Sequence, residues 1–267
     1  MLASGTMDFR NGKYILPNLF TLGSILFGVL AIIACLEGTD VGFRRAAIAI
    51  LAAVFADSLD GRVARLTRTA TQFGVQLDSL ADVVSFGVAP AVLAFSFGLH
   101  DLRAWDGMLG AALAFAFVSC GALRLARFNV MAMRTRSPQK TFVGLPIPAA
   151  ASVLALFVWV AVDLELPERA RVAGVAIAMP VLSFAMVSTL PYPSFKQVRW
   201  KVWNRLAFVV SLALIVWVAL VTRASSVLFA IALAYFATGP VAFLARLARR
   251  PERQNAEDAD AESSDEE

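Results

Sequence analysis

Histidine, cysteine and charged side chains are scarce in this 267-residue chain, and each scarcity excludes a class of protein. His100 is the single histidine, and one imidazole cannot build a histidine-based metal site. Cys35 and Cys120 each lie alone in an apolar run, so we expect neither a disulfide framework nor a thiolate metal site. Charged residues make up only 16% of the chain and hydrophobic residues 59%, with a mean hydropathy of +0.70. A soluble domain cannot bury that much apolar surface, so the composition predicts a polytopic membrane protein.

Eight charge-free runs mark the expected membrane spans. They are Tyr14–Leu36, Ala46–Ala56, Val83–Leu99, Gly107–Leu123, Thr141–Val162, Val172–Phe195, Leu206–Thr222 and Ala224–Ala245. Most have the roughly 17 to 25 residues that a helix needs to cross the hydrocarbon core. The second run is too short, and it can span only if its helix continues through Asp57 and Asp60. We therefore predict an all-α fold, a polytopic transmembrane helix bundle of about eight spans.

The basic residues are distributed unevenly between the two sides of this bundle. With the N-terminus inside, 18 Lys and Arg residues fall on the cytoplasmic side and six on the other. This bias predicts a multi-pass protein of the cell membrane with both termini in the cytoplasm. The last 17 residues, 251–267, hold eight acidic residues and one arginine, which predicts a disordered tail.

Four aspartates fall on two consecutive helices, where the membrane should still surround the chain. On the first helix, three- and four-residue spacings place on one face Asp57, Asp60, Gly61, Ala64, Arg65 and Arg68. On the next helix, Asp78 and Asp82 share a face with Ser85 and Phe86 by the same rule. Two antiparallel helices would bring the four carboxylates together near the cytoplasmic end of the membrane, where like charges need counter-cations.

The side chains around these carboxylates favour metal-assisted phosphoryl transfer. All-oxygen ligation without nearby His or Cys selects hard ions, Mg²⁺ or Mn²⁺ and also Ca²⁺, and four carboxylates suffice for two ions. Gly61 and Ala64 leave room for a nucleotide, while Arg65 and Arg68 can meet phosphate charge. The alternative is a buried salt-bridge cluster of Asp with Arg, which is less favoured because ionisable residues inside membranes are usually functional.

The aspartate series matches the signature of a known family. The matching positions are Asp57, Asp60, Gly61, Ala64, Arg65, Gly74, Asp78 and Asp82, and the chain therefore resembles the CDP-alcohol phosphotransferase family. The resemblance implies a bundle with a six-helix catalytic core, often dimeric, that uses CDP-linked substrates and divalent metal. It also implies metal ligation by all four aspartates, with Asp82 as general base as well.

Further segments extend the resemblance. The family's contacts to the CDP moiety would be Gly61, Arg65 and Thr71, joined by Asn18 and Thr21 on the first helix. Segments 85–91, 124–129, 142–150 and 192–196 resemble the branch of the family that uses serine. The implied substrates are CDP-diacylglycerol and L-serine, in contact with membrane lipid and in a homodimer, and we expect no nucleic-acid partner.

The carboxylate of serine requires a cation in a mostly apolar site. The candidates are Arg124, Arg127 and Lys196, with Ser85 and Asn129 as polar neighbours. Each of the three cations can instead be an anchor at the inner membrane face. The expected organisation is a cytoplasmic N-terminus (1–13), a catalytic membrane core (14–205), two additional helices (206–250) and the acidic tail (251–267).

Three alternative functions remain at this stage. The acceptor can be glycerol 3-phosphate or an inositol phosphate, whose extra charge would favour a denser cation pocket. A cation transporter could bind its ion with the four aspartates, although no other run contains a mid-span acid. A non-catalytic membrane scaffold would not need the full aspartate series.

Overall fold

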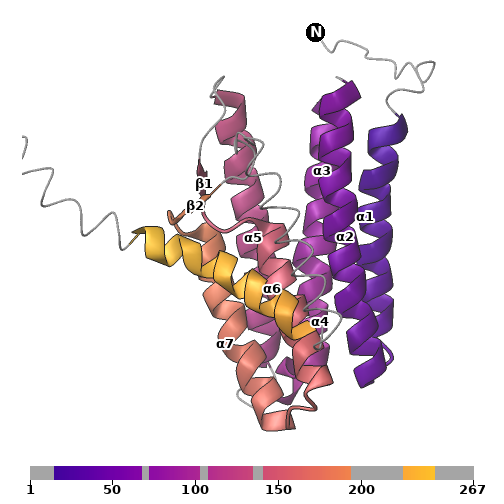
Figure 1. Cartoon of the computed structure of the whole chain (residues 1–267), viewed down its shortest axis with the longest axis vertical. Coiled ribbons are helices and arrows are strands. Elements are labelled where there is room, and N and C mark those ends of the chain that lie inside the picture. Colours follow the sequence, from indigo (N-terminus) through magenta and orange to yellow (C-terminus); the bar gives the residue numbers. More distant parts are fainter. Residues whose placement is uncertain (1–14, 68–71, 103–107, 135–140, 194–224, 244–267) are drawn as a thin grey trace, which may run out of the picture.

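The computed structural model describes residues 15–67, 72–102, 108–134, 141–193 and 225–243 (Figure 1). Its helices are α1 (Ile15–Cys35), α2 (Asp40–Thr67), α3 (Gln72–Asp82), the π-helical turn η2 (Val83–Val88), α4 (Ala89–Phe97), the 3₁₀ turn η3 (Leu99–Asp101), α5 (Met108–Arg134), α6 (Ile147–Asp163) and α7 (Glu168–Val187). A C-terminal helix, Ser225–Phe243, is drawn in yellow and crosses in front of α6. The prediction of a helical membrane bundle is confirmed.

Among the described residues, five helical segments are long and apolar enough to cross a membrane. They are Asn18–Cys35, Phe73–Phe97, Met108–Met131, Glu168–Val187 and Ser225–Phe243, and α6 is a shorter apolar helix. The expected span at 206–222 lies outside the described residues, so the number of eight spans stays a prediction.

The two helices that carry the aspartates continue beyond their apolar runs. This continuation was expected, because those runs are too short or barely long enough to span the membrane. Helix α2 has 28 residues and passes through Asp57 and Asp60 without a break. At the α-helical rise it is about 42 Å long, more than enough to span the hydrocarbon core. In the third span, α3 precedes the apolar run and forms with η2 and α4 one continuous 25-residue helical span, Phe73–Phe97.

A small β-sheet is the main departure from the all-α prediction. Strand β1 (Thr141–Val143) pairs antiparallel with β2 (Pro191–Pro193). The predicted helical runs 141–162 and 172–195 are therefore wrong at one end each, because α6 begins at Ile147 and α7 ends at Val187. Prolines in or near the two strands explain the difference. A proline supplies no N–H for a helical hydrogen bond, and it disfavours helical backbone in the residue before it.

Gly144 allows the chain to turn from β1 toward α6. Its φ angle is +81°, and a Cβ there would lie 2.4 Å from the carbonyl oxygen of Met186. Any other residue would clash with the end of α7 and adopt an unfavourable backbone conformation. The pairing of β1 with β2 thus depends on glycine at this position.

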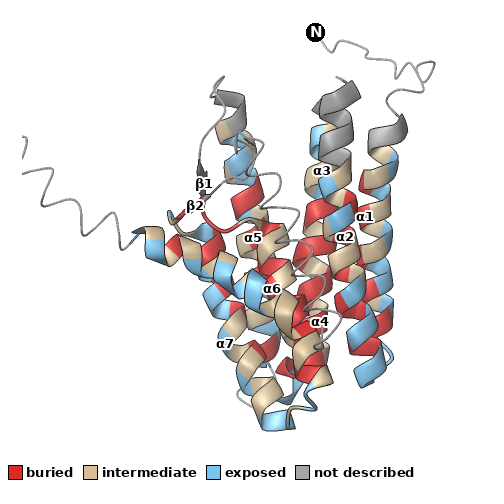
Figure 2. Cartoon of the chain, viewed as in Figure 1, coloured by how far each residue is buried: buried red, intermediate tan, exposed pale blue. Residues whose placement is uncertain are grey.

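Small side chains bring α1 and α2 close together in the core. Ala31 on α1 and Ala46, Ala47 and Ala53 on α2 are all fully buried. Large apolar side chains elsewhere on both helices are exposed, and Figure 2 colours the exposed residues of the two helices pale blue. Small residues at helix contacts and large apolar residues outside are typical of helices packed within lipid.

Candidate active site

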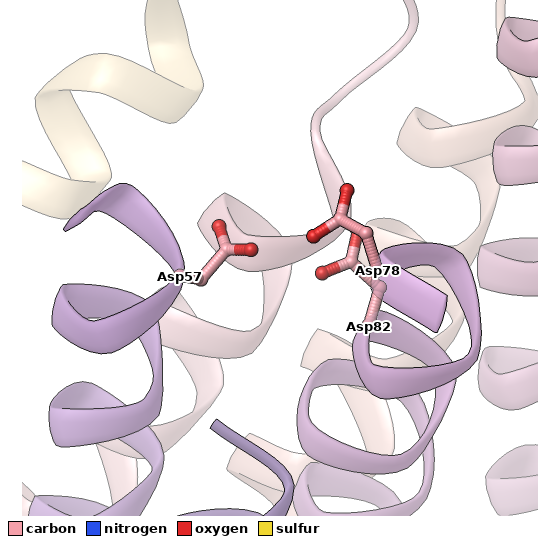
Figure 3. Close-up of side chains that lie close together, drawn as sticks. All are labelled: Asp57, Asp78 and Asp82. Carbon is pink, nitrogen blue, oxygen red and sulfur yellow. The ribbon is translucent and has the colours of Figure 1, made fainter. Parts of the chain in front are cut away.

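Three aspartate side chains, one from α2 and two from α3, converge near α1, the helix against which both α2 and α3 pack. One carboxylate oxygen from each of Asp57, Asp78 and Asp82 lies within 4.8 Å of the other two (Figure 3). Asp57 and Asp78 are half-buried, and Asp82 is only 9% exposed. The antiparallel arrangement of the two helices produces this convergence, because it opposes the C-terminal half of α2 to the last two turns of α3.

Other predicted site residues lie where side chains are not described. Asp60, Gly61 and Arg65 belong to α2, but only their backbone is described. Arg68, Thr71 and Lys196 lie outside the described residues altogether. Their predicted roles stay predictions: metal binding for Asp60, CDP binding for Gly61, Arg65, Arg68 and Thr71, and binding of the serine carboxylate for Lys196.

The three described carboxylates fit a hard divalent cation. Three ionised groups this close repel one another unless a cation lies among them. Carboxylate oxygens without histidine or cysteine in the group suit Mg²⁺, Mn²⁺ or Ca²⁺ rather than a softer metal. Any such ion would be held jointly by α2 and α3.

A π-helical turn follows Asp82 directly. In η2 the Ala89 N–H donates to the Val84 carbonyl, five residues earlier. Pro90 gives the physical reason, because in a regular α-helix its ring would press on the carbonyl four residues before it and it could donate no hydrogen bond. Wider turns of this kind occur frequently at functional sites, where they change the direction of the side chains that follow.

Ser85 lies in this π turn and contacts α1. It is fully buried, and its hydroxyl donates to the Ser24 carbonyl at 2.9 Å, while the Ser24 hydroxyl lies 3.3 Å from that of Ser85. Gly28, one turn after Ser24, is so close that a Cβ there would lie 2.9 Å from the Ser85 Cα. These contacts give Ser85 a packing role between α1 and η2. Sequence analysis missed Ser24 and Gly28, although two small residues four apart are a known signal for close helix packing.

The candidate cations of α5 have different surroundings. Arg124 is buried, stacks on the Phe128 ring at 5.5 Å and interacts electrostatically with Asp82. Helix α5, which carries it, packs against η2, the turn that follows Asp82. Asn129 connects α5 to α3, since its side-chain amide donates to the Ser79 hydroxyl at 2.8 Å.

Arg127 holds the backbone of other elements. Its guanidinium donates to the carbonyls of Val143 at 3.1 Å, Val187 at 2.9 Å and Ser188 at 3.2 Å. These bonds satisfy carbonyls at the C-terminal end of α7, which no helical N–H can reach, and connect them to β1. The described contacts thus favour a structural role for Arg127.

The two candidates on α1 lie near its N-terminal end. Thr21 is buried, at 5% exposure, and Asn18 is half-buried. The structure places them on the helix that contacts both α2 and α3. Their contact with a nucleotide stays a prediction.

Comparison with known proteins identifies the family. Residues 14–242 match the model of the family described as CDP-alcohol phosphatidyltransferase. The chain is 40% identical over 190 residues to the CDP-diacylglycerol–serine O-phosphatidyltransferase of Helicobacter pylori, covering 71% of this chain and 76% of that protein. It is 34% identical over 182 residues to the enzyme of the same name from Bacillus subtilis, covering 68% and 92%.

An archaeal relative extends the similarity. The archaetidylserine synthase of Methanothermobacter thermautotrophicus is 38% identical over 180 residues, covering 67% of this chain and 69% of that protein. Because the family model covers most of the chain and the aspartates of the motif meet between α2 and α3, the chain belongs to the CDP-alcohol phosphatidyltransferase family.

Proposed function

We propose that this protein transfers the phosphatidyl group of CDP-diacylglycerol to L-serine and releases CMP. The observation that carries the proposal is the convergence of Asp57, Asp78 and Asp82 within 4.8 Å, at motif positions of the family. Relatives named for transfer to serine, each covering about two thirds or more of both chains, support serine as the acceptor.

The chain's own residues divide the chemical work. Asp82 accepts the proton of the serine hydroxyl, as a general base must lie within hydrogen-bond reach of the group it activates. The freed oxygen forms a bond to the β-phosphorus, and the bond from that phosphorus to the bridging oxygen breaks, so CMP leaves. Arg124 is buried on α5, which packs against the turn that follows Asp82, and we assign to it the serine carboxylate.

The carboxylates would also hold the divalent metal. Asp57, Asp78 and Asp82 supply described oxygens, and Asp60 would complete the set. When bound, Mg²⁺ or Mn²⁺, as one ion or two, would supply positive charge that stabilises the negative charge on the phosphates as CMP leaves. The proposal includes a homodimer in the cell membrane. Its site would open to the cytoplasm, where serine is taken up, because the distribution of basic residues favours the cytoplasmic side.

Product analysis tests this function directly. Purified full-length protein in detergent would receive CDP-diacylglycerol, Mg²⁺ or Mn²⁺, and separately L-serine, glycerol 3-phosphate, inositol phosphate or no acceptor. We expect CMP and phosphatidylserine with serine, and none of either after treatment with a chelator. Faster reaction with glycerol 3-phosphate would refute serine while leaving the family chemistry intact. No CMP with any alcohol, from folded and metal-loaded protein, would favour ion transport instead.

A further inference from the structure

Two serines occupy matching positions beside the aspartates of the carboxylate cluster. Ser58 follows Asp57 on α2, and its hydroxyl donates to the carbonyl four residues earlier at 2.8 Å. Ser79 follows Asp78 on α3, and its hydroxyl also donates to the carbonyl four residues earlier, at 3.0 Å. Both bonds stay within their own helix. The two serines thus have the same local bonding, and a further contact distinguishes them.

Ser79 has a second hydrogen bond, which comes from a different helix. The side-chain amide of Asn129 on α5 donates to the Ser79 hydroxyl at 2.8 Å, across 50 residues of sequence. Both side chains are half-buried. The bond therefore connects α5 to α3 at the residue after Asp78 and one turn before Asp82.

The segment of α5 that carries Asn129 is itself fixed in the bundle. Arg127, two residues earlier, donates to the carbonyls of Val143 in β1 and Val187 in α7. Helix α5 also packs against α7 and η2, while α3 packs against α1. Helix α3 is therefore held by its packing on α1 and by the hydrogen bond from α5.

The carboxylates need such support before a cation arrives. Figure 3 shows Asp57 on α2 across from Asp78 and Asp82, with one oxygen of each within 4.8 Å of the other two. Ionised groups this close repel one another, and the repulsion favours an outward displacement of α3. The observed Kd of a ligand rises as the fraction of protein in the binding arrangement falls. A bond that holds α3 in place should therefore strengthen metal binding.

We propose that Asn129 is a positioning residue for the carboxylate cluster. Through Ser79 it holds α3 in place, so that the two aspartates of α3 meet Asp57 around a divalent cation. Sequence analysis had placed Asn129 among the polar neighbours of the acceptor serine, and the bond to Ser79 gives it a role toward the metal instead. This inference rests on the proposed function, because it takes the cluster as the metal site of that reaction.

The test measures Mn²⁺ binding to full-length protein in detergent, without substrate, from the electron paramagnetic resonance signal of free Mn²⁺. Asn129→Ala and Ser79→Ala each remove the bond between the helices, so we expect each to raise the Kd for Mn²⁺ roughly fivefold, the size of one ordinary hydrogen bond. Because both remove the same bond, the double variant should bind no more weakly than either single variant.

Two matched variants separate this bond from general damage. Ser58→Ala loses the same intrahelical bond beside Asp57, and Ser79→Thr keeps the hydroxyl that accepts from Asn129. Both should stay within about twofold of the wild-type Kd for Mn²⁺. At saturating Mn²⁺, Asn129→Ala should also leave the KM for L-serine within about twofold of wild type.

Three results would overturn the inference. The first is an unchanged Kd for Mn²⁺ in both Asn129→Ala and Ser79→Ala. The second is an equal loss of Mn²⁺ binding in Ser58→Ala. The third is a raised KM for serine at saturating Mn²⁺ in Asn129→Ala but not in Ser79→Ala, which would make Asn129 a contact of the acceptor. Wild-type protein that binds Mn²⁺ but forms no phosphatidylserine would refute the proposed function, whereas the Mn²⁺ series would still decide the role of Asn129.

Discussion

Arg124 and Arg127 lie one turn apart on α5, and their surroundings differ although their sequence context is alike. Arg127 donates hydrogen bonds to backbone carbonyls of β1 and of the end of α7, so it connects these two elements. Arg124 instead is buried and stacks on the Phe128 ring. The same side chain therefore serves as a structural clamp at one position and as a candidate substrate cation at the other.

At Asp82 the roles of metal ligand and general base can be separated. If Asp82 is the base, Asp82→Asn should lower turnover about 10²- to 10⁴-fold, and added Mg²⁺ or Mn²⁺ should not restore it. If it acts only as a ligand, high metal concentration should recover activity. The measurement is CMP release across a metal titration. Ser58→Ala is a suitable control, because Ser58 is exposed next to Asp57 and bonds only to its own helix, at the Val54 carbonyl.

At the scale of elements, α1 positions the π turn that follows Asp82. Ser24 bonds to Ser85, and Gly28 allows the backbones of α1 and η2 to approach closely. The elements of the site are also tied together far from the carboxylates. Arg171 on α7 binds Asp40, at the start of α2, through two bonds of 2.5 and 3.0 Å. Asp40 precedes Asp57 by 17 residues, about 26 Å along the helix.

The contact of α1 with η2 can be tested with two glycines of the same helix. Gly28→Ala would place a Cβ 2.9 Å from the Ser85 Cα, and we expect a loss of about 1–3 kcal/mol in stability from overpacking, with reduced activity. Gly23→Ala meets no atom within 4 Å and should gain up to about 1 kcal/mol from better helix propensity. Thermal unfolding in detergent checks both. Equal effects of the two substitutions would contradict the close approach.

The link between α2 and α7 predicts a dependence on pH. The hydrogen bond from Arg171 lowers the pKa of Asp40, which lies before the apolar part of α2, below its ordinary 3.8. A lowered pKa means that the stabilisation is present above pH 3.8 and disappears as the pH falls through the lowered value. Because the pair is partly exposed, Asp40→Asn should cost about 1 kcal/mol or less at neutral pH.

The comparison for this prediction is a more exposed pair nearby. Thermal unfolding of the wild type and Asp40→Asn should differ at pH 7 and converge in acid. Glu37→Gln removes the partner of Arg45, where the side chains are 41% and 64% exposed, and should change stability less. A difference for Asp40→Asn that stays constant down to acidic pH would argue against the ion pair as its cause.

For the whole molecule, the orientation in the membrane determines from which side serine can reach the site. The aspartate cluster lies between the end of α2 and α3, whereas Asp40, Asp101 and Arg169 lie at the ends of the helices remote from it. The 18 basic residues expected inside, against six outside, predict that the cluster lies nearer the cytoplasm.

Cysteine labelling in intact cells tests this orientation. In a background without Cys35 and Cys120, we expect Asp101→Cys and Arg169→Cys to react with a membrane-impermeant thiol reagent, because both positions are exposed. Ala70→Cys, between α2 and α3, should react only after the cells are opened. The opposite pattern would place the carboxylates on the outer side and exclude direct use of cytoplasmic serine.

The sequence by itself determined the membrane class, the family and the three carboxylates that meet. Apolar runs and the spacing of Asp57, Asp78 and Asp82 are local properties of the sequence. Hydropathy determines which segments insert into the membrane, and helical periodicity determines which face of a helix each aspartate occupies. The tertiary structure decided what depends on contacts between distant segments: the strand pair β1–β2, the carbonyls that bind Arg127, and the packing of Ser85 on Ser24, 61 residues away. A hydrogen bond between residues that far apart leaves no periodic pattern in the sequence, because the packing of the helices determines which two residues meet.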